Sequence, residues 1–590
     1  MPDFEVRAIE VHSGYAWDFR WISKVLEFAH RNDLNALVLH RNDVVDQVVF
    51  PGMLFGVGKG EAKNIFERYD IAYRKIYKYT PTRRSGPMLR RDYLRRVVEC
   101  AGRLGIAVYL ENKELFFPDV LLELFPELTK GGHVCASDPF WASFLETKYA
   151  ELLEDVPGIA GVITSLGTGE SRVSIASNRC TCDLCKATTT EQWYSRLFGA
   201  MYKPLAAKGK RLIVRDFVFT KKNQETLASQ FDALPADVAI AIKNTPHDYY
   251  PTFPANKLIE TLTKRDKWIE FDAMAQYFGW GIGPSAMLDD FRWRFAHARK
   301  HGAKGVILRT DWESLDGHTA FDTPNIVNLY AGAAFAGSGA ATDESICRKW
   351  LSEGAALAPS ASEADQREAV DWLAGLLSDS WGAIRKGLFV HDCVYNDCST
   401  FPVGYEQALW LTIEKNSLQD WVPEKASAYD ATEANILSII AEKDEALEEA
   451  IALERKATAK GPRAFKPEFI ARLREHFSAN ALYIKGFRAH ARLFAILRFG
   501  LEKKSAGAMP TDAMPTGAMS GEAKLGTATL SEALGRAFAE IDGVIAEYRR
   551  FYEATSLPHA FYQLLNADKL ECFRDDARRL AEKKLGWVLQ

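Results

Sequence analysis

VAIAIKNTPHDYY, residues 238–250, runs from five apolar residues straight into a polar cluster. The apolar run is too short for a helix and rich in β-branched side chains, so it predicts a buried strand. Pro246 and the polar residues around it mark the end of the strand and the start of a loop. A buried strand that ends in a lysine, an amide, an imidazole and a carboxylate is typical of the active-site rim of a barrel enzyme.

Seven more short apolar runs occur in the first 320 residues, at 6–11, 36–40, 106–110, 159–164, 211–217, 268–271 and 305–310. Amphipathic helical patterns separate most of them, at 18–32, 91–104, 138–154, 190–208, 223–233 and 285–302. Eight strands joined by helices predict an α/β fold, a (β/α)8 TIM barrel. The alternative is an open doubly wound sheet. The nucleotide-binding version of this alternative fold is disfavoured, because no G-x-G-x-x-G motif follows the first apolar run.

From about residue 323 the strand signals fade and helical periodicity dominates, most clearly at 433–457, 467–499, 528–555 and 572–586. We therefore expect a catalytic barrel over 1–322 and an all-α C-terminal domain over 323–590. The segment SAGAMPTDAMPTGAMSGEAKLG, residues 505–526, repeats AMPT and is rich in small residues, glycine and proline. That composition predicts a flexible excursion between helices.

Composition and charge narrow the class of protein. With 47% hydrophobic residues, 26% charged residues and a net charge of −4, the chain indicates an ordinary globular protein, with no electrostatic reason to bind nucleic acid or anionic membranes. The start, MPDFEVRAIEV, shows no signal-peptide pattern, and no apolar run approaches the roughly 18 residues of a membrane span. Nine cysteines without a regular framework favour a reduced, cytoplasmic setting.

Polar residues follow all eight predicted strands, at the end where barrel enzymes carry their chemistry. Two carboxylates that flank a sugar are the usual machinery of glycoside hydrolysis. Glu170, in the glycine-flanked GTGES, is the candidate acid, and Asp248 and Asp272 compete for the second role. The candidates for substrate binding are His12, His40, Glu111, Arg215, Lys243, Asn244, Gln276, Tyr277, Trp280, Arg309, Asp311 and Trp312.

Arg215 and Lys243 fall on adjacent predicted strands and could clamp an anionic group such as the carboxylate of a uronic acid. The alternative is that they merely pair with Asp216 and Asp248. The expected substrate is therefore an oligosaccharide with a terminal uronic acid or a similar sugar.

Several segments resemble glycoside hydrolase family 67, the α-glucuronidases of xylan breakdown. AIKNTPHDYYP is similar to a motif in which the lysine, here Lys243, binds the substrate carboxylate and the aspartate, here Asp248, is one of two catalytic carboxylates. LIVRDFVF resembles a motif whose arginine, here Arg215, also faces the uronate. WIEFDAMAQYFGWG resembles the following strand segment, and TPNIVNLYAGAAFA with DESICRKWL resembles the entry into a helical C-terminal domain. The resemblance covers roughly residues 150–560.

The chain departs from this family at three points. Gln276 stands before Tyr277 where the family has its second catalytic carboxylate, and a glutamine cannot act as a general base. Ile163 replaces a lysine of the fourth strand, and the nearest glutamate, Glu170, is displaced by a few residues. The family's amino-terminal β domain is lacking, since the barrel pattern begins at once. We therefore expect a distant relative with altered specificity.

Cys180, Cys182 and Cys185, in NRCTCDLCK, have a spacing that lets three thiols face one metal ion. His133, Cys135 or water could complete the set. A structural zinc site, plain reduced thiols and a catalytic metal are the three interpretations; apart from that zinc, no cofactor is expected.

Two other function classes stay open. One is a non-hydrolytic sugar-binding or degenerate barrel, left after Gln276 replaced the base. The other is a metal-dependent hydrolase or lyase that uses His12, His40 and His247. The helical domain is expected to supply a wall of the site or a homodimer interface.

Overall fold

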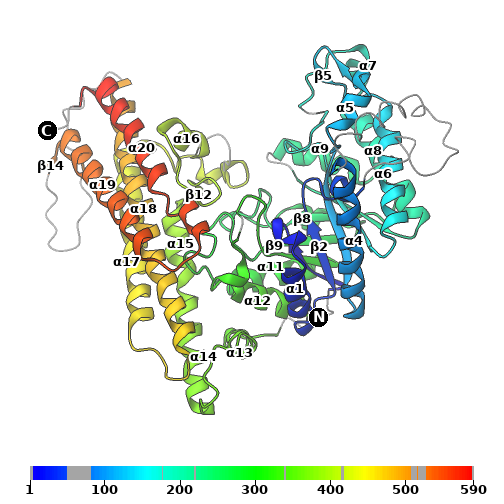
Figure 1. Ribbon diagram of the computed structural model, residues 1–590. Helices are drawn as coiled ribbons and strands as arrows, with labels where there is room; N and C mark the ends of the chain where they lie inside the picture. The colour runs from blue at the N-terminus through cyan, green and yellow to red at the C-terminus, as the bar shows by residue number, and fades with distance from the viewer. Residues whose placement is uncertain are drawn as a thin grey trace.

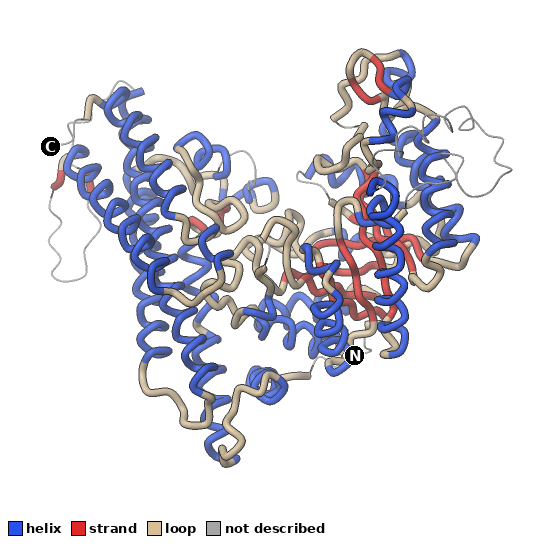
Figure 2. The backbone as a smooth tube through the Cα atoms, in the orientation of Figure 1, coloured by secondary structure: helices blue, strands red, loops and turns tan. Residues whose placement is uncertain are grey.

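The computed structural model describes residues 4–49, 82–175, 177–217, 221–315, 317–337, 340–412, 418–505, 514–515 and 527–587. Eight parallel strands close into a barrel in the order β1-β10-β9-β8-β7-β6-β3-β2 (Figure 2). They are β1 (Val6–Val11), β2 (Ala36–His40), β3 (Ala107–Glu114), β6 (Gly161–Leu166), β7 (Arg211–Arg215), β8 (Ala239–Lys243), β9 (Lys267–Asp272) and β10 (Gly305–Arg309). The predicted (β/α)8 barrel is confirmed.

Burial on both faces explains why the strands are apolar without interruption. In β8, Ala239 and Ala241 point into the barrel, where they belong to an interior cluster with Trp268. Ile240 and Ile242 point outward and join the main core with the surrounding helices. The small residues leave room for the indole of Trp268, and a Cβ on Gly305 would lie only 2.8 Å from that ring.

The helices that cover the barrel are α1 (Phe19–Arg31), α4 (Thr82–Arg103), α6 (Phe140–Asp155), α8 (Thr190–Ala207), α9 (Lys221–Phe231), α11 (Leu288–Lys300) and α12 (Ile326–Ala336). α12 lies beyond the predicted boundary at residue 322, yet it packs against β10. A Cβ on Gly332 of α12 would lie 2.5 Å from Leu308 of β10, so the glycine permits this close approach.

Helices predominate in the described residues from 340 onward, as expected, with only short two-residue strands among them. They are α13 (Asp343–Glu353), α14 (Glu363–Ser378), α15 (Ser380–Leu388), α16 (Tyr405–Trp410), α17 (Glu433–Thr458), α18 (Pro467–Ser505), α19 (Leu530–Ala554) and α20 (Ala567–Leu580). The long helices α17, α18 and α19 lie side by side, with α18 in contact with both others (Figure 1). Residues 506–513 and 516–526, most of the predicted excursion, lie outside the described residues. Among the described helices, none combines the length and hydropathy needed to cross a membrane.

The helical region meets the barrel through the loop between β12 (Cys393–Val394) and α16. Ser399 in this loop accepts a hydrogen bond from the Gly279 backbone at 2.8 Å and donates one to the Gln276 carbonyl at 2.8 Å. Tyr483 of α18 donates to the Ser399 carbonyl from the other side. The loop is therefore fixed between α18 and the segment that follows β9.

Candidate active site

A cavity of about 170 Å³ opens at the carboxyl ends of the strands. Every barrel strand except β2, or the loop that follows it, contributes to its wall, together with one residue of the helical region. The lining consists of His12, Lys113, Glu170, Arg215, Phe217, Lys243, Asp248, Tyr249, Tyr250, Gln276, Tyr277, Arg309, Trp312, Glu313 and Cys398. Nine of the predicted site residues are among them: Glu170, Asp248, Arg215, Lys243, His12, Gln276, Tyr277, Arg309 and Trp312.

Asp248 lies in the loop that follows β8, within the stretch 238–250 that predicts the strand and its polar end. Its carboxylate is 2.6 Å from the Lys243 ammonium, and the Tyr277 hydroxyl also bonds to it. Burial alone would raise the pKa of Asp248, but the Lys243 ammonium and the His247 ring outweigh burial and lower that pKa well below its usual range. Asp248 is therefore ionised at neutral pH, which suits a general base or a nucleophile.

The backbone around Asp248 is shaped to present this carboxylate. Asp248 has a φ of 42°, in the left-handed region, and its carbonyl accepts a hydrogen bond from the Thr245 hydroxyl at 2.5 Å. Asparagine and aspartate tolerate this conformation better than other non-glycine residues. The polar turn that follows the strand thus directs the side chain back toward Lys243.

Arg215, at the end of β7, is held by two carboxylates below the cavity. Its Nε and Nη2 lie 2.7–3.0 Å from the oxygens of Glu270, and its Nε is 3.2 Å from Glu111. Nη2 also donates to the Tyr249 hydroxyl at 3.0 Å. Of the two pairings considered for the clamp residues, the one between Lys243 and Asp248 is present. Arg215 pairs with Glu270 and Glu111 rather than with Asp216.

Three cationic side chains lie around the ring of Phe217. The Lys243 ammonium lies 4.2 Å, the Lys113 ammonium 4.9 Å and the Arg215 guanidinium 5.0 Å from the ring centroid. Cation–π attraction partly compensates the mutual repulsion of these groups. The arrangement concentrates positive charge on one wall of the cavity.

Glu170 lies in the loop after β6 and contacts the Lys113 ammonium of β3. Lys113 is almost fully buried, whereas the side chain of Glu170 is 39% exposed. Burial lowers the pKa of Lys113 to about 7. The Ser171 hydroxyl donates to the Glu114 carbonyl at 2.6 Å, which fixes this loop against β3.

A layer of buried histidines and glutamates lies at the carboxyl ends of β1 and β2. The rings of His12 and His40 stack at 3.6 Å, and His40 lies 2.9 Å from Glu10 and 3.3 Å from Glu111. Burial lowers the pKa of both histidines and raises the pKa of Glu111 to about 7. His40 and Glu111, both predicted substrate ligands, do not line the cavity.

Glu10, His12 and His40 bring three ligand atoms close enough to hold one metal ion. The Arg309 guanidinium, however, donates to Nδ1 of His12 at 2.7 Å. A metal ion at this position would face that positive charge and compete for the same nitrogen, so the donor set does not fit a cation. His247 packs elsewhere, with its ring 5.8 Å from the ring of Tyr250.

Asp272 and Asp311 bind backbone amides behind the wall. The Asp272 carboxylate accepts hydrogen bonds from the N–H groups of Met274, Ala275 and Gln276, at 3.0, 3.1 and 2.6 Å. Asp311 accepts from the N–H groups of residues 12 and 13 at 2.6 and 3.1 Å. Each carboxylate holds a cavity-lining loop in place, and neither lines the cavity itself.

Asn244 and Trp280 also lie behind the lining. The Asn244 carbonyl accepts from Arg294 at 3.3 Å. The indole N–H of Trp280 donates to the Cys398 carbonyl at 2.7 Å, and its ring lies 5.1 Å from that of Trp312. Both residues support the wall rather than form it.

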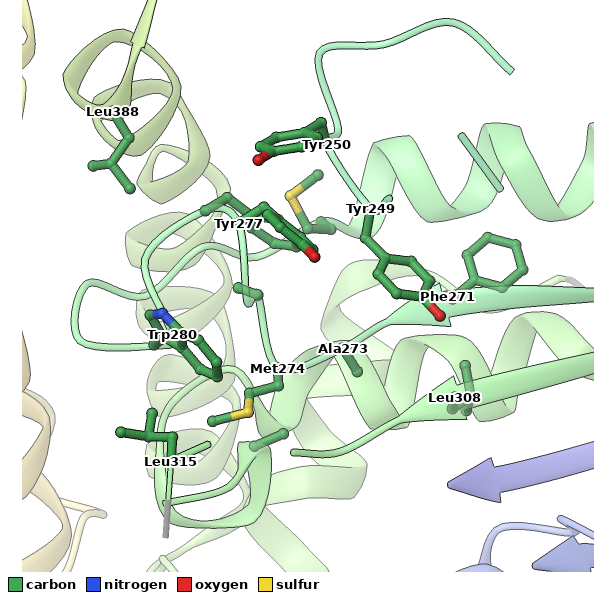
Figure 3. Packing of buried hydrophobic residues seen from close by; sticks show 14 of the residues in the cluster. Tyr249, Tyr250, Phe271, Ala273, Met274, Tyr277, Trp280, Leu308, Leu315 and Leu388 are labelled. Atoms are coloured by element: carbon green, nitrogen blue, oxygen red, sulfur yellow. The ribbon is translucent and has the colours of Figure 1, made fainter. Parts of the chain in front are cut away.

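Aromatic rings and a thiol complete the cavity. The ring centroids of Tyr250 and Tyr277 are 4.4 Å apart, and Tyr249 lies nearby (Figure 3). Cys398, from the helical region, is 3.6 Å from the Gln276 amide nitrogen. No local sequence signal could place Cys398 here, because 122 residues separate it from Gln276.

Five further lining residues could be found from their position in the sequence. Lys113, Phe217, Tyr249, Tyr250 and Glu313 all come at or just after the end of a predicted strand. In a barrel, this position alone makes a residue a candidate for the site.

No protein-family model matches the chain, and no curated protein matches it. Among solved structures, an enzyme of glycoside hydrolase family 138 that targets the pectin rhamnogalacturonan II is similar with a TM-score of 0.58 and 10% identity, over 99% of this chain and 69% of that one. A mutant of the Thermobaculum terrenum O-GlcNAc hydrolase has a TM-score of 0.45 and 11% identity, over 98% of this chain and 95% of that one. At 10% identity, the similarity to the family 138 enzyme shows a shared fold. The relationship to family 67 is not shown by these comparisons and stays a prediction.

Proposed function

We propose that the protein is a glycoside hydrolase that removes a terminal sugar, a uronic acid, from an oligosaccharide. The observation that carries this proposal is the cavity at the carboxyl end of the barrel. It combines an ionised carboxylate, Asp248, with a second carboxylate, Glu170, and several lysine and arginine side chains. Two carboxylates that face one sugar are the usual requirement for glycosidic cleavage. The similar family 138 enzyme, which targets a pectin, fits the same class of reaction.

The environments of the two carboxylates favour different roles. Asp248 is ionised, so it activates the attacking water or attacks the anomeric carbon itself. Glu170 lies in a partly exposed loop, where a leaving group can reach it. Glu170 is the acid that protonates the leaving oxygen, and the Lys113 ammonium is in contact with it.

The charge on the wall favours an anionic sugar. Four basic residues line the cavity, Lys113, Arg215, Lys243 and Arg309, against three acidic ones, Glu170, Asp248 and Glu313. A sugar carboxylate that enters the cavity would meet Arg215 and Lys243 beside the ring of Phe217.

Hydrolysis of a panel of uronate and neutral glycosides tests the proposal, with Glu170→Gln and Asp248→Asn as the variants. We expect each variant to lose about 10²- to 10⁴-fold in rate, the usual contribution of an acid or base. Glu146→Gln is the matched control, because Glu146 pairs with Lys203 on the surface of α6. If both site variants keep full activity on every cleaved glycoside, the catalytic assignment is wrong.

Two other results of the same panel would replace the proposal. Binding of a uronate without any hydrolysis would indicate a sugar-binding barrel. A metal-dependent enzyme would be indicated if two results occur together. A chelator abolishes the activity without unfolding the protein, and the Asp248→Asn variant is as active as the wild type.

A further inference from the structure

Four cysteines meet at one end of the molecule, and none of them lines the cavity. Cys135 follows β5 (His133–Val134), the second strand of a short hairpin after β3. Cys180, Cys182 and Cys185 belong to the segment between β6 and α8, and Cys185 lies in α7 (Asp183–Ala187). β5 and α7 lie together beyond the barrel, at the upper right (Figure 1).

The four sulfur atoms have the spacing of a tetrahedral metal site. All four lie within 4.8 Å of one another, and Sγ of Cys135 is 3.6 Å from that of Cys182 and 3.4 Å from that of Cys185. Zinc binds thiolate sulfur at about 2.3 Å, so sulfurs at the corners of a tetrahedron around it are about 3.8 Å apart. These two separations are close to that value and far above a sulfur–sulfur bond of about 2.05 Å.

These thiols do not behave as packing residues of the apolar core. Cys135, Cys180 and Cys185 are buried, yet among the described residues they form a small cluster of their own, with Cys182 packed against it. Cys347 and Cys393, by contrast, are part of the main core. A group of thiols that mainly contact one another gains little as hydrophobic packing, whereas a metal ion would make use of all four.

The backbone around Cys135 is fixed by neighbours outside the cluster. The indole N–H of Trp141 donates to the Cys135 carbonyl at 2.8 Å, and that of Trp193 donates to the next carbonyl, of Ala136, at 2.9 Å. In the loop that carries the other three cysteines, the Cys180 N–H donates to the Asn178 side chain at 3.0 Å. Ligands held in this way lose little conformational freedom when an ion binds.

We propose that Cys135, Cys180, Cys182 and Cys185 bind one structural zinc ion as four thiolates. Thiolate ligands select zinc over magnesium or calcium, which prefer oxygen. With all four tetrahedral positions taken by protein, no position is left for water or substrate, so the ion is structural rather than catalytic. The Lys130 ammonium, 3.8 Å from Sγ of Cys135, offsets part of the net negative charge of a zinc with four thiolates.

The ion would join the loop after β3 to the loop after β6. The second of these loops also carries Glu170, and the first follows the strand that carries Lys113. Zinc at this position would therefore restrict the relative movement of the segments that hold the Lys113–Glu170 pair. The metal site itself does not depend on the proposed function.

Metal analysis of the full-length protein, purified without chelator, tests the proposal. We expect about one zinc per chain, and loss of that zinc in Cys135→Ser and in Cys182→Ser. Cys572→Ser is the matched control, since Cys572 is an exposed free cysteine outside the cluster, and it should keep the zinc. Full zinc content in Cys135→Ser would contradict the four-cysteine set.

Cobalt substitution gives a second measurement that needs no variant to fold. Wild-type protein reloaded with Co²⁺ should show the visible bands of a tetrahedral site and the near-ultraviolet charge-transfer bands of thiolate ligands. Absence of zinc from the purified protein, together with absence of these bands, would overturn the proposal. Neither result depends on hydrolytic activity, so failure here is distinguishable from failure of the glycosidase proposal.

Discussion

Replacing Lys243 with methionine would leave the Asp248 carboxylate buried without its cation. Lys243 is 3% exposed and Asp248 is 7% exposed, and their charged atoms are 2.6 Å apart. Removing one partner of a buried ion pair costs about 3–5 kcal/mol, because the remaining buried charge loses its counter-charge. We expect Lys243→Met to lower the free energy of unfolding by about this amount at neutral pH.

The penalty should depend on pH. In the wild type the pKa of Asp248 is below its unfolded value, so the pair stabilises the fold above about pH 4 and loses this contribution as the pH falls through the folded pKa. In Lys243→Met, burial raises the pKa of Asp248, and the carboxyl takes up a proton as the pH falls. The difference between wild type and variant is therefore largest at neutral pH and shrinks toward pH 4.

Urea unfolding at pH 7 and at pH 4.5 measures both effects. The double variant Lys243→Met/Asp248→Asn removes both charges of the pair, so it should recover much of the loss. Lys203→Met, at an exposed pair with Glu146, is the control and should change little. The reasoning is refuted if Lys243→Met is no less stable than the control, or if the double variant is as unstable as the single one.

Three further changes test other parts of the structure. Because Lys113 has a pKa of about 7, the KM for an anionic substrate should rise above pH 7 in the wild type, and Lys113→Arg should move that rise to higher pH in a pH series of KM. Gly283→Ala would place a Cβ 2.0 Å from Oδ1 of Asn480, so it should cost about 1–3 kcal/mol, measured as a lower Tm. Asp272→Asn weakens bonds to three backbone amides and should cost about 1.5–3 kcal/mol in urea unfolding, with a lower kcat. A KM independent of pH from 6 to 8.5, an unchanged Tm, or an Asp272→Asn enzyme with wild-type stability would each contradict the corresponding argument.

The barrel could be predicted because both faces of its strands are buried. A strand such as β8 is then apolar without interruption, and the change to polar residues at Lys243 marks its carboxyl end within one residue. The strand-end rule works for the same reason, since parallel strands direct their ends to one rim. This rule correctly identified Lys243, Asp248 and Arg215 as residues that line the cavity.

The same rule could not tell which polar side chain faces the cavity and which binds the backbone. Asp272 and Asp311 follow strands as Asp248 does, but their oxygens are taken by main-chain amides. That distinction depends on loop geometry, not on residue type. Contacts between distant segments, such as that of Cys398 with Gln276, leave no local pattern in the sequence. A cytoplasmic location and a homodimer through the helical region stay predictions.

The most direct test of the central claim compares two glycosides that share linkage and leaving group and differ only in a carboxylate or a hydroxymethyl group on the sugar. The cations around Phe217 predict that the wild type prefers the uronide in kcat/KM, roughly ten- to a hundredfold, the worth of one bond to a charged group of about 1.5–3 kcal/mol. A neutral glycoside cleaved equally well or better, or no cleavage of either compound, would contradict the account.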